Sequence, residues 1–271
     1  MPRIVAHRGF SSRFPEATRA AYQAAIRWSA ETGIELGLEC DVHFSADDQL
    51  ICLHDLSVRR TSKVQGRAID LTVAQLKRLN FGSRAVVEQG PAGRELITLA
   101  ELMAMVRDAR SAGVRVELVI ETKHPNPRGV AVEERVAELL GDYGWDRPGS
   151  PVRVISFSPS ATRWFARHLR DVERSLLIKT WFGRWRDGSL PDGVGTAGVS
   201  VNLLKIDPGY VRRAHARGHQ VHAWTVNTPE EIAFCTDLGV TGLTSDYPDR
   251  VAEVLMGSAT VTSHRATQAV R

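Results

Sequence analysis

Residues 37–55 read GLECDVHFSADDQLICLHD, and this stretch decides both the fold and the position of the candidate site. Glu39 and Asp41 lie two positions apart in an apolar run that is typical of a strand. Their carboxylates therefore share one face, and the apolar neighbours share the other. Two acids on one face of a buried strand repel each other unless one keeps its proton or a cation lies beside them. The sequence therefore predicts a cation at this strand.

The same stretch folds back on itself. Only a short polar segment, residues 45–48, separates the first apolar run from a second one at residues 50–53, which ends on His54-Asp55. A parallel connection needs a dozen or more residues, so the second run must return antiparallel to the first. This hairpin brings His54 toward the two carboxylates.

Strand and helix patterns alternate along the rest of the chain, and eight strands are predicted besides the returning run. They begin at Ile4, Leu38, Val116, Val152, Leu176, Val199, Val221 and Leu243. This alternation predicts an α/β fold, a TIM (β/α)8 barrel, although residues 183–195 show no convincing helix. A doubly wound open sheet is the alternative. It would gather ligands at one switch point, whereas here polar residues follow nearly every strand.

A long polar insertion follows the second strand. It spans residues 56–95 and contains one clear short helix, over residues 73–79. A connection of this length is unusual in a compact domain and predicts a lid. We expect residues 1–256 to form a single domain and residues 257–271 to be a disordered tail.

Composition excludes several classes of protein. The chain has 271 residues, of which 43% are hydrophobic and 24% charged, with a formal net charge of +4. The arginines are scattered rather than gathered in one block, so we expect no nucleic-acid partner. No apolar run approaches the roughly 18 residues of a membrane span, and no signal peptide is visible. We therefore expect a cytoplasmic protein without stable membrane insertion, and the sequence does not predict its oligomeric state.

An ordered set of short motifs spans nearly the whole chain. The motifs are Ala6-His7-Arg8-Gly9, Phe14-Pro15-Glu16-Ala17-Thr18, Glu39-Cys40-Asp41, His54-Asp55, Glu121-Thr122-Lys123, Ser156-Phe157, Trp224-Thr225-Val226-Asn227 and Asp246-Tyr247-Pro248. Taken together they resemble the motifs of the glycerophosphodiester phosphodiesterases. One departure is Ala17, where the family motif has asparagine.

The resemblance implies a TIM-barrel enzyme that hydrolyses glycerophosphodiesters to sn-glycerol 3-phosphate and an alcohol with the help of a divalent cation. It implies that His7 and His54 are the catalytic pair and that Glu39, Asp41 and Glu121 are the metal ligands. Three carboxylates suit a hard ion, Mg²⁺ or Ca²⁺, and two histidines that titrate near neutral pH can divide the roles of acid and base.

Other residues have two interpretations each. Arg8 and Lys123 either contact the phosphate of the substrate or only pair with the acids. Trp224 is either a core residue or an aromatic wall for the substrate. Glu16 either begins its helix or serves the site.

Two further functions remain as alternatives. One is a lipid phosphodiesterase of the lysophospholipase D or sphingomyelinase D type. The other is a catalytically silent barrel that binds phosphodiesters. A silent barrel should have lost an acid, a base or a metal ligand, and none of these residues is missing here.

Overall fold

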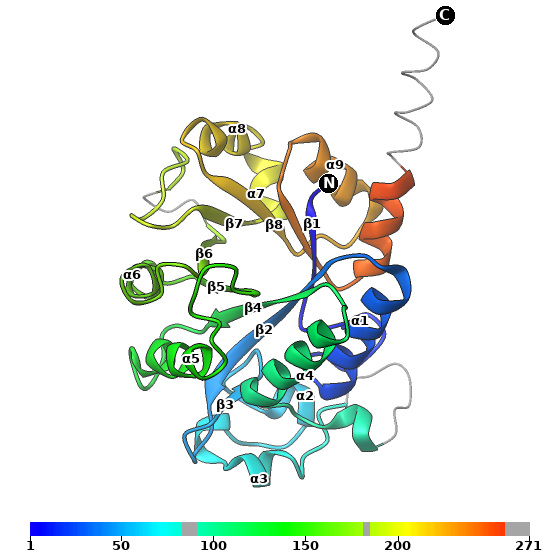
Figure 1. Cartoon of the computed structure of the whole chain (residues 1–271), viewed down its shortest axis with the longest axis vertical. Helices are drawn as coiled ribbons and strands as arrows, with labels where there is room; N and C mark the ends of the chain where they lie inside the picture. Colours follow the sequence, from blue (N-terminus) through cyan, green and yellow to red (C-terminus); the bar gives the residue numbers. More distant parts are fainter. Residues whose placement is uncertain (83–90, 181–184, 258–271) are drawn as a thin grey trace, which may run out of the picture.

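Parallel strands close into a barrel surrounded by helices (Figure 1). The structure is a computed structural model that describes residues 1–82, 91–180 and 185–257. Within these residues the barrel strands are β1 (Arg3–Ala6), β2 (Leu36–Phe44), β4 (Val116–Thr122), β5 (Val152–Ser156), β6 (Glu173–Ile178), β7 (Thr196–Ser200), β8 (Gln220–Trp224) and β9 (Gly242–Ser245). Pairing of β1 with both β2 and β9 closes the barrel. The predicted TIM barrel is confirmed, although β2, β6 and β7 begin two or three residues earlier than predicted.

The fold-back after β2 is also confirmed. Strand β3 (Leu50–Cys52) pairs antiparallel with the end of β2, with Val42 opposite Cys52 and Phe44 opposite Leu50. Because β3 continues the sheet beyond β2, it lies outside the closed ring of parallel strands.

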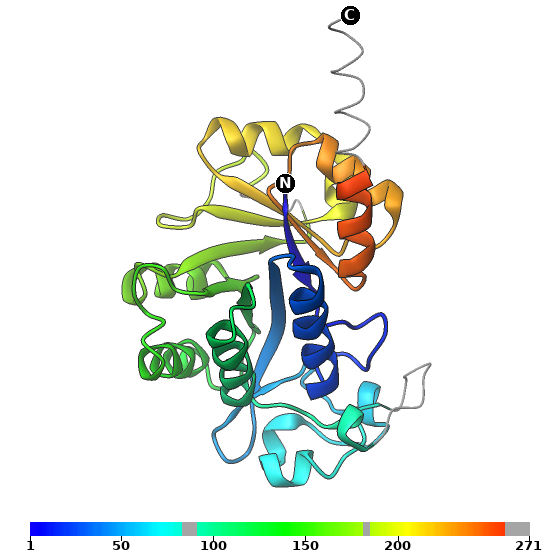
Figure 2. The same ribbon diagram turned by 45° about the vertical axis from the view of Figure 1, so that its right-hand side comes forward.

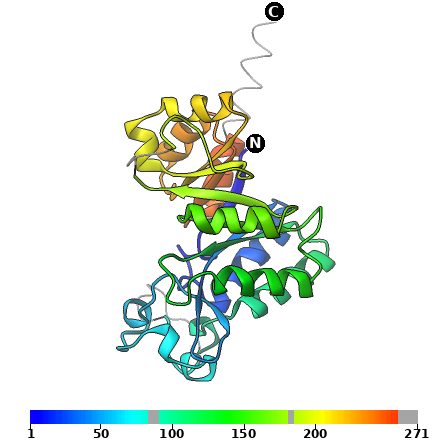
Figure 3. The same cartoon turned by 90° about the vertical axis from the view of Figure 1, so that its left-hand side faces the viewer.

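Helices follow most of the strands and cover the outside of the barrel (Figures 2 and 3). They are α1 (Arg19–Thr32), α4 (Leu99–Ser111), α5 (Ala131–Asp142), α6 (Pro159–His168), α7 (Val201–Ile206), α8 (Gly209–Ala216), α9 (Pro229–Asp237) and a last helix over residues 248–257. The described part of the link between β6 and β7 holds no helix, as the sequence indicated. Helix α7 was not predicted, because its buried apolar residues Val201, Leu203 and Leu204 directly follow β7, and a short apolar run does not distinguish strand from helix.

Local signals set several helix ends. Thr18 caps α1 by accepting a hydrogen bond from the backbone N–H of Ala21, and Gly33 ends the helix at φ +68°. Thr98 and Glu101 form a capping box at the start of α4. Short-range contacts therefore set where these helices begin or end.

The side chains of β2 alternate between two environments. Leu36, Leu38, Cys40 and Val42 belong to the main hydrophobic core. Glu39 and Asp41 lie on the opposite face, which looks into the barrel. A small apolar cluster of Val5, Val119, Ile155 and Leu177, from four different strands, fills part of that interior.

The insertion packs at the lower end of the molecule in all three views. It contains α2 (Arg59–Ser62), η1 (Ala68–Asp70), α3 (Val73–Leu76) and η2 (Pro91–Arg94). The expectation of a single helix over residues 73–79 was therefore wrong, since α3 is shorter and three other short helices accompany it. Buried residues of the insertion form a second cluster with the hairpin, including Ile51, Leu53, Val58 and Leu76. Its role as a lid stays a prediction.

The C-terminal tail predicted from residue 257 lies outside the described residues, apart from residue 257 itself. Among the described helices, none has the length and apolarity needed to cross a membrane.

Candidate active site

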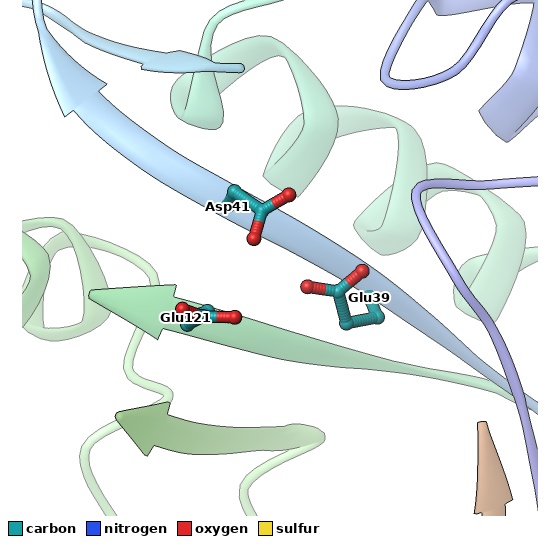
Figure 4. Close-up of side chains that lie close together, drawn as sticks. All are labelled: Glu39, Asp41 and Glu121. Atoms are coloured by element: carbon teal, nitrogen blue, oxygen red, sulfur yellow. The ribbon is translucent and has the colours of Figure 1, made fainter. Parts of the chain in front are cut away.

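Three carboxylates converge inside the barrel (Figure 4). Glu39 and Asp41 project from β2, and Glu121 projects from the neighbouring strand β4, where the register pairs it with Asp41. One oxygen from each side chain lies within 4.8 Å of the others. The three residues are buried, with 3%, 1% and 6% of their surface exposed, so water screens their charges poorly. Parallel pairing of β2 with β4 thus completes the acidic group that the sequence began.

Two basic side chains lie against these acids. Lys123 Nζ lies 2.7 Å from Asp41 Oδ1 and 2.6 Å from Glu121 Oε1, and Arg8 Nε lies 3.2 Å from Asp41 Oδ2. Arg8 also donates its backbone N–H to Glu39 Oε2 at 2.9 Å. Even so, the buried atoms Arg8 Nε, Asp41 Oδ2 and Glu121 Oε1 complete no hydrogen bond among the described residues. Three acids therefore face two cations, and the cluster carries an excess negative charge when all three acids are ionised.

The protonation of the three acids is uneven. Burial raises the pKa of Glu121 to about 8, and the charge of Asp41 adds to this effect. Burial also raises the pKa of Glu39 well above its usual range. Burial opposes ionisation of Asp41 too, but the charges of Lys123 and Arg8 outweigh it and hold the pKa of Asp41 below its usual range. Without a further cation, the group therefore retains protons that a bound ion would displace. This behaviour, together with an all-oxygen donor set, fits a hard divalent cation.

The turn after β1 presents Arg8. Arg8 has φ +56° and Gly9 has φ +81°, both in the left-handed region. A Cβ at Gly9 would lie 2.7 Å from the backbone carbon of Ala21, so only glycine lets this turn pack against α1. Ala17 has φ +57°, and its N–H donates to the carbonyl oxygen of Arg8 at 2.9 Å. Asparagine adopts this conformation more readily than alanine, which gives a backbone reason for the asparagine in the family motif.

His7 follows β1 directly and is oriented by a carboxylate. Its Nδ1 lies 2.7 Å from Oδ1 of Asp246, which follows β9. Asp246 is held in turn, because its Oδ2 accepts a hydrogen bond from Asn227 Nδ2 at 2.7 Å and its Oδ1 accepts one from Ser11. Burial opposes ionisation of Asp246, but these hydrogen bonds, that of His7 above all, lower its pKa.

His54 has a matching arrangement. Its Nδ1 lies 2.6 Å from Oδ1 of Asp55, and its carbonyl oxygen lies 3.1 Å from Nε2 of His43 on β2. Burial lowers the pKa of His54, and the charges of Arg8 and Lys123 lower it further. His43 is buried, and its contact with the backbone of His54 ties β2 to the residue that carries the imidazole.

Trp224 lies at the end of β8, on a different part of the barrel wall. Its ring packs edge-on against Phe157 with 5.4 Å between ring centroids, and both rings contact the interior apolar cluster. The indole N–H is buried without a partner among the described residues. Trp224 is therefore partly a core residue with one unused donor. Trp185 packs against the main core, whereas Trp181 lies outside the described residues.

Glu16 neither caps its helix nor joins the three converging carboxylates. Oε1 of Glu16 accepts a hydrogen bond from Arg8 Nη1 at 2.8 Å, and both of its oxygens accept from Arg60 in the insertion. Sequence reasoning missed Arg60 and the orienting role of Asp55. One arginine among many carries no local signal, and only the closed fold brings it to Glu16.

The chain is similar over most of its length to known proteins. Residues 7–250 match the family model described as the glycerophosphoryl diester phosphodiesterase family. A Mycobacterium tuberculosis relative named "Probable glycerophosphodiester phosphodiesterase 1" is 36% identical over 92% of this chain and 90% of its own length. A Bacillus altitudinis protein named glycerophosphodiester phosphodiesterase is 28% identical over 94% of this chain and 98% of its own length.

Solved structures share the fold. A glycerophosphodiester phosphodiesterase from Parabacteroides distasonis aligns with a TM-score of 0.73 at 22% identity, covering 95% of this chain and 98% of that one. An Oleispira antarctica phosphodiesterase, solved in complex with the product sn-glycerol-3-phosphate, aligns with a TM-score of 0.74 at 21% identity, covering 94% and 97% of the two chains.

Proposed function

Because the chain belongs to the glycerophosphoryl diester phosphodiesterase family, we propose that it hydrolyses small glycerophosphodiesters to sn-glycerol 3-phosphate and an alcohol, with a divalent cation and two catalytic histidines. The observation that carries this proposal is the convergence of Glu39, Asp41 and Glu121 within 4.8 Å. Arg8, which lies just after β1, and Lys123, which directly follows β4, both lie against Asp41.

Glu39, Asp41 and Glu121 would hold the cation, Mg²⁺ or Ca²⁺. When bound, the ion supplies positive charge that neutralises the phosphoryl oxygens and orients the attacking oxygen. The oxygen-only donor set and the raised pKa values of Glu39 and Glu121 support this assignment.

His7 and His54 would act as the general acid and the general base. Each Nδ1 lies within 2.7 Å of a carboxylate oxygen, so Nδ1 carries a hydrogen and donates a hydrogen bond to that oxygen. Nε2 is then the ring atom that can accept or deliver a proton. Because both histidines have the same arrangement, the geometry is compatible with either assignment of the two roles.

Arg8 and Lys123 would contact the phosphate of the substrate. A phosphodiester carries a negative charge that repels an attacking oxygen, and fixed cations reduce that barrier. Both side chains already lie against Asp41, so the interpretation as partners of the acids also holds. The two roles are compatible, because a guanidinium has five N–H donors and an ammonium has three.

The direct test is an assay of the purified protein on a panel of glycerophosphodiesters with each metal in turn, in which release of sn-glycerol 3-phosphate is measured. We expect glycerophosphocholine or glycerophosphoethanolamine to be hydrolysed at least as efficiently as lysophosphatidylcholine. A clear preference in kcat/KM for the lysolipid, measured below its micelle concentration, would instead support the lipid phosphodiesterase.

The histidines are tested by His7→Ala and His54→Ala, each of which should lower kcat by roughly 10² to 10⁴, the usual contribution of general acid–base catalysis. His215→Ala, which changes an exposed histidine on α8, is the matched control and should keep wild-type kcat. A folded His54→Ala variant with wild-type kcat would refute the role of His54. Absence of turnover on every substrate with every metal would favour the silent barrel.

A further inference from the structure

We infer that Arg60, in the insertion after the hairpin, is a positioning residue for the phosphodiester hydrolysis: it holds the two carboxylates that orient His54 and Arg8. The inference rests on the proposed function, in which His54 moves a proton and Arg8 contacts the phosphate. It gives the insertion a part in the reaction that does not depend on closure as a lid.

All three nitrogens of the Arg60 guanidinium are used. Nη1 donates to Glu16 Oε2 at 2.6 Å and Nη2 donates to Glu16 Oε1 at 2.7 Å, while Nε donates to Oδ2 of Asp55. The side chain is 31% exposed, so water screens these contacts only partly. Hydrogen bonding to Glu16 raises the pKa of Arg60, which remains charged.

Each carboxylate that binds Arg60 also binds a candidate site residue. Asp55 Oδ1 lies 2.6 Å from Nδ1 of His54, and Glu16 Oε1 accepts from Arg8 Nη1 at 2.8 Å. Arg8 Nε lies 3.2 Å from Asp41 Oδ2. Opposite charges therefore alternate without a break from the Asp55 beside His54, through Arg60, Glu16 and Arg8, to Asp41.

The geometry requires an arginine. A guanidinium is planar and can bind one carboxylate with two parallel hydrogen bonds while Nε points to a second carboxylate. An ammonium is a point charge and cannot fix both carboxylates in one plane. The backbone that carries Arg60 is fixed by the insertion: Val58, immediately before α2, is fully buried in the second hydrophobic cluster, and its N–H donates to the carbonyl oxygen of Gly66 at 3.1 Å.

The test compares Arg60→Ala, Arg60→Gln and Arg60→Lys with Arg59→Ala, which removes the exposed neighbouring arginine of the same helix. We expect Arg60→Ala and Arg60→Gln to lower kcat by about 10- to 100-fold, the usual effect of a residue that orients a site side chain. KM should change less, Arg60→Lys should recover part of the loss, and Arg59→Ala should match the wild type. Arg60→Gln carries the test if Arg60→Ala loses its cooperative unfolding transition.

A double-mutant cycle with His54→Ala separates positioning from a merely structural role. If Arg60 acts through Asp55 on His54, its replacement should cost much less in kcat when His54 is already alanine. An equal loss in both backgrounds would overturn the action of Arg60 on His54 through Asp55, and kcat within two-fold of the wild type for Arg60→Gln would overturn the inference as a whole. Wild-type kcat in His54→Ala alone would overturn the proposed function instead, so the two failures are distinguishable.

Discussion

His7 and Asp246 are 239 positions apart in the sequence, yet Nδ1 of His7 lies 2.7 Å from Oδ1 of Asp246. Each residue directly follows a strand, and those strands, β1 and β9, pair in parallel with Ala6 opposite Ser245. Closure of the barrel therefore creates this contact. A carboxylate that accepts from Nδ1 sets the tautomer and the direction of the imidazole.

Replacement of Asp246 should impair proton transfer. In Asp246→Asn the amide can turn its NH₂ group toward Nδ1, which favours the tautomer with the proton on Nε2. We expect kcat to fall by about 10²-fold or more, within the range of general acid–base catalysis. The measurement is kcat at saturating substrate. Asp237→Asn, at an exposed position of α9, is the control and should be unchanged. Equal activity of the two variants would contradict the orienting role.

Removal of the metal should abolish turnover. Excess chelator should abolish hydrolysis, and added Mg²⁺ or Ca²⁺ should restore it, because the ion supplies the positive charge that neutralises the phosphoryl oxygens. Burial raises the pKa values of Glu39 and Glu121, so binding of the ion must displace protons from these acids. Calorimetry at pH 7 in buffers of different ionisation enthalpy should therefore show proton release on binding. Glu121→Gln should weaken binding and reduce this release, because the proton on Glu39 is still displaced. Full activity in excess chelator would contradict the metal site.

The metal-free protein should lose stability as the pH rises from 7 to 8. Burial raises the pKa of Glu121 to about 8, from 4.5. The folded state therefore binds more protons than the unfolded state in this window, and the free energy of unfolding falls with increasing pH. The histidines with lowered pKa act at lower pH, which is why the window begins at 7. Chemical denaturation in chelator should show a fall of up to about 1 kcal/mol per pH unit. Glu121→Gln should make this fall smaller, and an unchanged slope in that variant would show that the fall does not come from Glu121.

His222 should make stability sensitive to acid. It is 7% exposed, its Nδ1 lies 2.9 Å from Nη1 of the buried Arg153, and burial lowers its pKa to about 4. As the pH falls, the unfolded state binds this proton before the folded state does. The contribution of neutral His222 to stability is therefore present above pH 6.5 and lost as the pH falls toward 4. Between pH 7 and pH 4, wild type should lose about 3 kcal/mol more than His222→Gln. His215→Gln should behave as wild type. Parallel curves for wild type and His222→Gln would contradict the buried neutral histidine.

Trp224 should affect binding more than chemistry. Its half-buried ring lies against Phe157 inside the barrel, where it can contact a substrate in the ground state and the transition state alike. Such uniform binding changes KM and leaves kcat nearly constant. We expect Trp224→Ala to raise KM by roughly 10-fold, with Trp224→Phe intermediate, in steady-state assays. A fall in kcat at unchanged KM would contradict this expectation, because it would show that the ring contributes only in the transition state.

The sequence by itself determined the local relationships. Two carboxylates at Glu39 and Asp41 must share a face because side chains alternate along a strand. A short polar link after β2 forces an antiparallel return, which carries His54 to the strand that bears the acids. The repeated alternation of strand and helix predicted the barrel, whereas it was the resemblance to the family motifs that implied Glu121 as a third metal ligand.

Only the tertiary structure decided which distant charges meet. Nothing local marks Arg60 among the scattered arginines, or predicts that Glu16 would face it. The uneven protonation of the three acids also depends on how deeply they are buried and where Lys123 lies. The physical reason is the sequence separation over which each effect acts. Alternation and turn length act over a few residues and can be read in sequence order, whereas burial, ion pairing and pKa depend on the closed barrel, which brings together residues from opposite ends of the chain.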